Sequence, residues 1–191
     1  MTLQKINTRN TVLVLMIIAA GAFRFISYKF PYMLSNFTPV GAIALFGGAY
    51  FTDKWKAYLV PLLTLFISDI LLNYLYSSKW VLWREDSLWV YLCFAIIVLV
   101  GTMIKKANVL NVFLASLAGV VIHWLLTDMP WMNGNLYTHD LAGYAKSLYM
   151  AIPFEKNMLY GDIVFCGILF GGFELAKTKY TFLRSKRELA L

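Results

Sequence analysis

The chain has 191 residues, of which 60% are hydrophobic and 14% charged, and its mean hydropathy is +0.66. Because soluble domains carry about 25% charged residues, these values exclude an ordinary soluble protein and indicate an integral membrane protein. The formal net charge of +7 could suggest nucleic-acid binding, but the basic residues lie between apolar segments, as membrane topology signals do. We therefore expect a single membrane domain that binds no nucleic acid.

Six apolar segments predict an all-α membrane protein with six transmembrane helices. They cover residues of about 11–28, 38–52, 57–76, 87–104, 107–127 and 158–176. A spanning helix needs about 20 residues, so the second segment is short, and either it is tilted little or its loop partly enters the membrane. A basic tail, 177–191, completes the single domain 1–191.

The lysines and arginines set the predicted orientation. If both termini are cytoplasmic, eleven of the 17 basic residues lie inside and six lie outside. The first apolar run lacks a small-residue cleavage site and is followed by further apolar sequence, so we predict no cleaved signal peptide. The expected protein is multi-pass with both termini in the cytoplasm.

The stretch 36–51 is expected to organise the bundle as a central helix. Its small residues are Gly41, Ala42, Ala44, Gly47, Gly48 and Ala49. Ala44 and Gly48 have the small-xxx-small spacing that lets membrane helices approach closely. Asn36 and Thr38 are candidate caps, and Pro39 fits a first helical turn.

Two polar residues in the third segment, Asp69 and Asn73, stand four apart and share a helix face. An acid at membrane depth is expensive, so Asp69 should face protein or water, either as a structural group or as a ligand-binding or ion-coupling group. Arg24, near the outer end of the first segment, either snorkels to the head groups or turns inward to pair with Asp69 or a ligand anion.

The remaining segments carry few reactive side chains. His123 has no second histidine or cysteine at ligand spacing on its helix, so we predict no metal site and no cofactor. Cys93 and Cys166 lie inside apolar runs and are expected to be buried free thiols. The fourth segment, 87–104, contains no charged residue and is predicted to be the most lipid-exposed helix.

The longest connection, 128–157, is predicted to be outside and functional, because long loops in compact proteins usually are. Within it, residues 140–152 have apolar side chains at three-four spacing. This pattern predicts a separate amphipathic outer helix between helices 5 and 6 that lies on the bundle or dips into it.

On this topology the polar residues gather in the outer half of the bundle. The candidate ligand-binding residues are Asn36, Asp69, Asn73, His123, Trp131 and Asp162, with Arg24 as a candidate charge partner. A channel needs polar groups along its whole depth, whereas polarity that stops part-way suits a blind pocket open to the outside. No HExxH, GxSxG or phosphate-binding glycine loop is present, so catalysis has little support.

Several motifs resemble a bacterial family of small six-helix membrane proteins of unassigned function. They are residues 36–42 (Asn-Phe-Thr-Pro-Val-Gly-Ala), 45–49 (Leu-Phe-Gly-Gly-Ala), 66–69 (Phe-Ile-Ser-Asp), 151–154 (Ala-Ile-Pro-Phe), Asn157, 161–162 (Gly-Asp) and 169–174. That family is grouped with the substrate-binding S components of energy-coupling-factor vitamin transporters. The resemblance covers nearly the whole chain. It implies an S-component-like bundle with a ligand site near the outer surface, lined by helices 4 to 6 and the outer loops.

The resemblance leads us to expect a protein of the bacterial inner membrane that captures a vitamin-like small molecule in an outward-facing pocket for uptake. Its partners would be that ligand, the lipid bilayer and either an energy-coupling module or none. The Ala-xxx-Ala docking pattern of S components is missing, because Phe23 follows Ala19 four residues on. Two alternatives are a membrane enzyme acting on a lipid or prenyl substrate at the outer leaflet and an accessory subunit of a larger complex.

Overall fold

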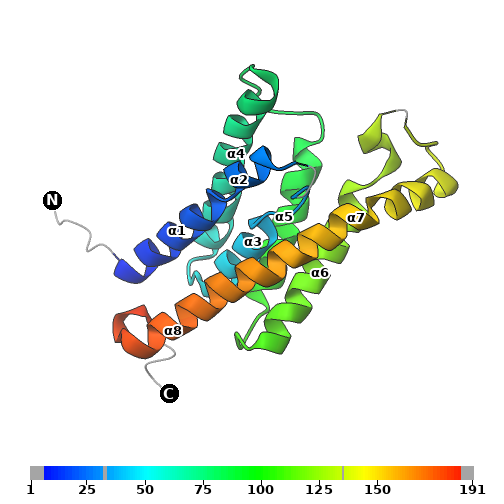
Figure 1. Ribbon diagram of the computed structural model, residues 1–191. Helices are drawn as coiled ribbons and strands as arrows, with labels where there is room; N and C mark the ends of the chain where they lie inside the picture. The colour runs from blue at the N-terminus through cyan, green and yellow to red at the C-terminus, as the bar shows by residue number, and fades with distance from the viewer. Residues whose placement is uncertain (1–6, 32–33, 135, 186–191) are drawn as a thin grey trace.

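The computed structural model describes residues 7–31, 34–134 and 136–185, and within them every regular element is helical (Figure 1). The helices are α1 (Thr8–Gly21), α2 (Arg24–Lys29), α3 (Val40–Tyr50), α4 (Lys54–Ser77), α5 (Ser87–Thr102), α6 (Val109–Thr127), α7 (Leu141–Cys166) and α8 (Gly172–Lys179). Short 3₁₀ turns, η1 (Pro130–Asn133) and η3 (Thr181–Leu183), and a π-helical turn, η2 (Gly167–Gly171), complete the order.

Each of the six predicted segments falls on a helix, but their lengths differ. Four helices are long and apolar enough to cross a membrane, namely Thr8–Lys29, Lys54–Ser77, Val109–Thr127 and Leu141–Lys179. The other two, α3 and α5, are shorter apolar helices. The prediction of a helical membrane protein therefore agrees with the structure, while only four of the predicted helices reach the length of a full span.

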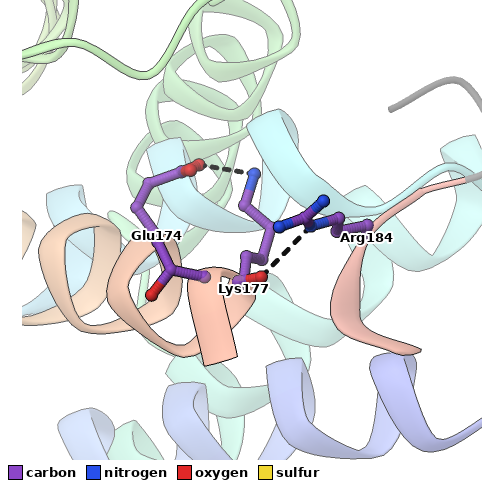
Figure 2. A pocket seen from close by; sticks show the side chains of 4 residues that line it. Glu174, Lys177 and Arg184 are labelled. Carbon is purple, nitrogen blue, oxygen red and sulfur yellow. Dashed lines mark hydrogen bonds and ion pairs between the residues drawn. The ribbon is translucent and has the colours of Figure 1, made fainter. Parts of the chain in front are cut away.

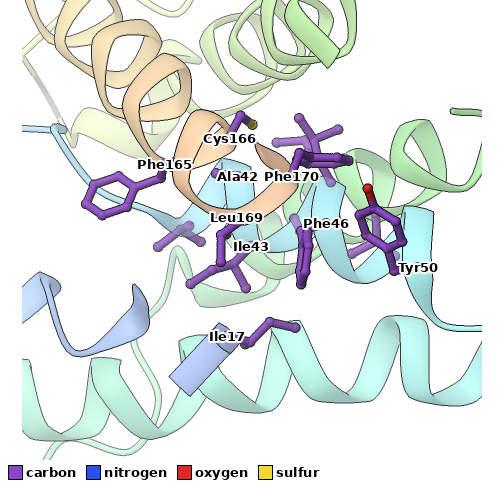
Figure 3. Packing of buried hydrophobic residues seen from close by; sticks show 14 of the residues in the cluster. Ile17, Ala42, Ile43, Phe46, Tyr50, Phe165, Cys166, Leu169 and Phe170 are labelled. Carbon is purple, nitrogen blue, oxygen red and sulfur yellow. The ribbon is translucent and has the colours of Figure 1, made fainter. Parts of the chain in front are cut away.

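Helix α3 lies at the centre of the bundle, as the sequence predicted. Ten of its 11 residues are buried, and it packs against α1, α4, α5, α6 and α7. Figure 3 shows its aromatic residues meeting the last long helix, with the rings of Phe46 and Phe170 5.5 Å apart in an edge-to-face contact. At about 1.5 Å per residue, α3 is about 16 Å long, roughly half of a bilayer core of about 30 Å.

The small residues of α3 permit this central position. A Cβ built on Gly48 would lie 2.9 Å from the backbone nitrogen of Thr102, and one built on Gly101 would lie 2.9 Å from Cα of Leu45. Neither distance leaves room for a side chain, so α3 and α5 pack backbone against backbone. The close approach predicted from the small-residue spacing is confirmed.

The start of α3 differs from the prediction. Pro39 occupies the N-cap position rather than the first turn, and no side chain caps the helix there. Asn36 instead adopts a left-handed conformation with φ of 58°, a conformation that asparagine tolerates better than most residues. The first-turn N–H groups of α3 are therefore left to a partner from elsewhere in the fold.

The predicted amphipathic helix is not a separate element. Residues 141–152 form the first turns of a single helical rod that continues to Lys179. The rod has 39 residues and is about 58 Å long, well beyond the bilayer core. Pro153 lies inside it, and three hydrogen bonds hold its outer part against the end of α6. These bonds are Trp124 Nε1 to Leu148 O, Tyr144 Oη to Leu125 O and Ser147 Oγ to Asp128 O.

The inward face of the outer part of α7 also differs from the expected one. Gly143, Ser147 and Ala151 are buried, whereas Leu141 and Tyr149 are exposed. Small and polar residues thus face the bundle and apolar residues face outward, which suits a helix surrounded by lipid rather than water.

The prediction that the fourth segment is the most lipid-exposed helix was wrong. Cys93, Phe94, Ile97, Val98 and Gly101 of α5 are all buried, because the missing side chain at Gly101 lets α5 pack directly on α3. Lack of charge therefore reflected a central position. Cys93 and Cys166 are both buried and free, as predicted.

Candidate functional site

A cavity of about 220 Å³ opens between α2, α4 and the connection from α2 to α3. The described residues that line it are Arg24, Ser27, Tyr28, Pro31, Leu34, Ser35, Asn36, Thr38, Leu72 and Tyr76. Half of these residues belong to the non-helical connection, so much of the wall is irregular backbone. The cavity lies at the end of the bundle opposite the start of α1 and η3, which are joined by a hydrogen bond from Arg9 Nε to Leu183 O.

Arg24 is the charged group of this cavity. Its Nη1 forms an ion pair with Asp69 Oδ1 at 2.7 Å and also donates to Ser68 Oγ. Asp69 accepts a second bond from the hydroxyl of Tyr91 at 2.8 Å. The Arg24 and Asp69 side chains are 15% and 27% exposed. A largely buried polar network therefore joins α2, α4 and α5.

One donor of Arg24 is not used by this network. The Nε atom is buried, and no described residue accepts a hydrogen bond from it. A buried N–H without a partner is costly, so Arg24 is not fully satisfied by the groups that the structure describes around it.

A second polar feature lies deeper, where α7 meets the start of α3. Asp162 is fully buried, and neither of its oxygens has a hydrogen-bond partner among the described residues. The backbone N–H of Ala42 points toward the carboxyl group without reaching strict hydrogen-bond geometry. Because the N-terminal end of a helix carries partial positive charge, the first turn of α3 is a favourable place for this acid.

The third polar feature is a pair between α6 and α7. His123 Nδ1 and Glu155 Oε1 are 3.0 Å apart, and their side chains are 16% and 7% exposed. The other oxygen of Glu155 is buried without a described partner. Asp128, just beyond the end of α6, lies within electrostatic range of both. Burial and the charge of Glu155 raise the pKa of Asp128 to about 6, although His123 acts in the opposite direction.

The predicted site residues are therefore divided among several places. Arg24 and Asn36 line the cavity, and Asp69 lies behind Arg24. His123 of α6 pairs with Glu155 of α7, and Asp162 belongs to α7 itself and faces Gly41 at the start of α3; neither lines the cavity.

The remaining two predicted residues belong to neither group. Asn73 donates from Nδ2 to Val81 O at 3.1 Å and so holds the α4–α5 connection in place. Trp131 lies in η1, is 55% exposed, and is not among the residues that line the Arg24 cavity.

Two participants, Glu155 and Tyr91, were not among the predicted site residues. Glu155 had a signal in the sequence, because Gly143, Ser147 and Ala151 precede it at intervals of four. This stripe of small and polar residues marks the inward face of α7. Tyr91 follows a cluster of tryptophans at the end of a loop, and nothing in that pattern distinguishes it from an interfacial aromatic residue.

A further cavity of about 230 Å³ lies at the end that holds the termini, lined by Glu174, Lys177, Thr178 and Arg184 (Figure 2). Lys177 Nζ is 2.8 Å from Glu174 Oε1, and Arg184 Nε donates to the carbonyl oxygen of Lys177. Glu174 also accepts a hydrogen bond from the hydroxyl of Tyr50, at the C-terminal end of α3. These mutual contacts make this cavity part of the packing between α3 and the C-terminal segment.

Comparisons with known proteins place the chain in a family without assigning an activity. The model of a family of unknown function, DUF6580, matches residues 4–185. No curated protein and no solved structure matches the chain. The described residues also contain no group of three histidine, cysteine or acidic side chains that could hold a metal ion.

Proposed function

The chain belongs to DUF6580, a family of unknown function, and we propose that it is a membrane transport protein that binds a vitamin-like small molecule in the Arg24 cavity. The supporting observation is the cavity wall. The described part of the α2–α3 connection is non-helical, and it lines the cavity directly. Within a bilayer, such backbone is tolerated only where it is covered by protein or lines a water-filled space.

The short helix α3 supports the same proposal. Its C-terminal residue, Tyr50, lies at the end of the bundle that holds the termini, because Arg9 Nη2 donates to the Tyr50 carbonyl oxygen at 2.7 Å. With a length of about 16 Å, α3 then begins near mid-depth. Half-helices that begin at the midplane, next to irregular backbone, are how many transporters build their solute sites.

The cavity lining indicates the kind of solute. Arg24 contributes a positive charge to the lining, and Asn36 and Thr38 contribute polar side chains. The aromatic rings of Tyr28 and Tyr76, 4.7 Å apart, lie beside these polar groups. A few placed polar groups beside aromatic and aliphatic surface are typical of sites for small, partly apolar molecules. A volume of about 220 Å³ restricts the bound part to a small ring system or its equivalent.

The orientation and location form part of the proposal. With both termini in the cytoplasm of a bacterial inner membrane, the Arg24 cavity faces outward, in the direction needed for uptake. The excess of basic residues on the terminal side supports this orientation. The resemblance to vitamin-transporter S components adds the solute class, and an energy-coupling module is a candidate partner.

The alternative of a membrane enzyme has less support from the geometry. An acid/base pair must reach the substrate it acts on. His123 pairs with Glu155, but both side chains are mostly buried and neither lines the Arg24 cavity. The cavity itself contains no histidine, cysteine or acid among its described lining residues.

Thermal unfolding of the purified protein in detergent, with and without each member of a vitamin panel that includes corrinoids, tests the proposal. A ligand at a hundredfold excess over its Kd should stabilise the protein by about 2.7 kcal/mol. Arg24→Lys keeps a positive charge beside Asp69 but removes the Nε donor, and Thr38→Val removes a hydroxyl from the cavity. Both should weaken the response, whereas Thr178→Val in the opposite cavity should leave it unchanged. The absence of any stabilising compound, or equal responses in all variants, would contradict the proposal.

A further inference from the structure

His123 and Glu155 contact each other but line neither the Arg24 cavity nor the cavity around Lys177. His123 comes from α6 and Glu155 from α7, and they meet at 3.0 Å in a largely buried position. The Oε1 atom of Glu155 faces the histidine ring, while Oε2 is buried without a described partner. An acceptor of this kind normally has a hydrogen-bond partner in a folded protein, so its vacancy needs an explanation.

The charges around the pair are mainly negative. Asp128 beyond the end of α6 and Asp162 two turns further along α7 both lie within electrostatic range of Glu155, as does the thiol of Cys93 from α5. Among the described residues, His123 is the only basic side chain that forms an ion pair with any of these three acids. Glu155 and Asp128 therefore share one histidine, and Asp162 is a third acid within electrostatic range of Glu155.

A buried carboxylate without compensation is strongly unfavourable, so a carboxyl group of this cluster is stabilised when it binds a cation or a proton. Its ligating side chains do not form a group that could hold a metal ion, within the part of the chain that the structure describes. A proton needs only one acceptor atom, and Glu155 Oε2 offers it.

We propose that the His123–Glu155 pair is a proton-binding site, in which the added proton bonds to Glu155 Oε2 while His123 Nδ1–H donates to Oε1, and that this proton drives the proposed solute uptake. The proton comes from water at the end of the bundle opposite the termini, past Asp128, and returns to water after the bundle rearranges. The second half of this proposal rests on the proposed function, and the first half does not.

The position of the pair explains how proton binding would reach the rest of the fold. Adjacent to it, Trp124 Nε1 donates to Leu148 O and Ser147 Oγ donates to Asp128 O, so α6 and α7 are joined around the pair. Phe94 of α5 packs on the His123 ring at a centroid distance of 5.8 Å. A change in the charge of the pair therefore acts on the contacts among α5, α6 and α7.

Infrared difference spectroscopy tests the proton site without any solute. Wild-type protein in lipid, brought from about pH 8 to about pH 5, the range in which histidine changes charge, should gain a protonated-carboxyl band. The part of that band that comes from Glu155 should shift when glutamate carries a ¹³C carboxyl group and should be missing in Glu155→Gln, whereas the part that comes from Asp128 should neither shift nor disappear. Glu85→Gln, in the α4–α5 connection, should keep both parts. A band of which no part shifts on glutamate labelling overturns the proton site even if Glu155→Gln fails to fold.

Coupling is tested with whichever vitamin of the panel gives the largest thermal shift, taken up by proteoliposomes under an imposed pH gradient. Wild-type uptake should fall at least tenfold when a protonophore collapses the gradient, and Glu155→Gln should show no response to the gradient. Uptake that ignores the gradient overturns the coupling. If no vitamin binds, the uptake role falls with the proposed function while the infrared result still decides the proton site.

Discussion

The carboxyl group of Asp162 in α7 lies directly against Gly41 in the first turn of α3. A Cβ built on Gly41 would lie 2.9 Å from Cγ of Asp162, and closer still to both carboxyl oxygens. The absence of a side chain at Gly41 therefore makes room for the acid. Since Pro39 provides no side-chain cap, the carboxyl oxygens of Asp162 are the acceptor atoms placed beside the start of α3. Asp162 and Gly41 stand 121 positions apart in the chain. The two glycine-containing motifs, 36–42 and 161–162, form the two sides of one contact.

This relationship predicts the effect of Asp162→Asn. The amide keeps the shape of the side chain but replaces one acceptor oxygen with an N–H donor beside the first-turn N–H groups of α3. We expect a loss of about 1–3 kcal/mol in the free energy of unfolding, the usual cost of an unsatisfied buried polar group, measured by denaturation in detergent. Asp86→Asn is the matched control, because Asp86 also stands at a helix start but pairs with Arg84 on the surface. Equal stability of Asp162→Asn and wild type would contradict the capping role.

A second prediction concerns the packing of α3 on α5. Gly48→Ala places a methyl group against backbone atoms of Val98, Gly101 and Thr102, which cannot move without shifting α5. Overpacking of this kind costs about 1–3 kcal/mol. A Cβ at Gly167 meets nothing within 4 Å, so Gly167→Ala should be neutral or stabilising by up to about 1 kcal/mol through helix propensity. Similar melting temperatures for the two variants would show that the close α3–α5 contact does not limit stability.

The sequence predicted the helices of this fold better than the boundaries and connections between them. Periods of apolar residues located all six helical rods, and the small residues of α3 identified the central one. The continuity of α7 was missed because Pro153 and the three-four apolar spacing indicated a separate amphipathic helix. In lipid that spacing marks the outward face, so the same residues belong to one long rod.

The site was predictable only in part, for a related reason. Arg24 and Asp69 are both charged residues in apolar segments, and their pairing was one of two alternatives that the sequence left open. Glu155 fell within a stretch predicted to be a loop outside the membrane, where an acidic residue is common and does not indicate a functional site. Once α7 is continuous, Glu155 becomes an acid on the inward face of a membrane helix, which is a strong functional signal.

The Arg24–Asp69 pair should show a large coupling energy in a double-mutant cycle. Arg24→Met leaves a partly buried carboxylate with Tyr91 as its one described partner, and Asp69→Asn leaves a partly buried guanidinium without its counter-charge. The two single changes together should therefore lower the free energy of unfolding by more than the double change does. We expect coupling of about 1–3 kcal/mol for this pair, against about 0.2–1 kcal/mol for exposed pairs. The exposed Arg84–Asp86 pair, whose side chains are 60% and 33% exposed, is the control. Equal coupling in the two cycles would show that Arg24 and Asp69 are effectively solvated.

The last prediction uses two aspartates whose pKa values move in opposite directions. Burial, with the charge of Glu155, raises the pKa of Asp128 from 3.8 to about 6. Between these values the folded protein holds a proton that the unfolded chain has lost, so this group's contribution to stability is present below pH 3.8 and disappears as the pH rises through about 6. Asp128→Asn should therefore gain stability relative to wild type over that window and show a constant difference above it.

The pKa of Asp140 is shifted in the opposite direction, so Asp140→Asn serves as a comparison in the same experiment. Its Oδ1 accepts a hydrogen bond from the backbone N–H of Gly143 at 2.7 Å, and this bond, with a further one from Thr138, lowers the pKa of Asp140 below 3.8. Its stabilising contribution is therefore present above pH 3.8 and is lost as the pH falls through the lowered value. The measurement is the free energy of unfolding of wild type, Asp128→Asn and Asp140→Asn across pH. The difference between Asp128→Asn and wild type should grow as the pH rises toward 6. The difference between Asp140→Asn and wild type should shrink as the pH falls below 3.8. If Asp128→Asn follows wild type in parallel across the window, Asp128 is solvated and is not held in the polar cluster around Glu155.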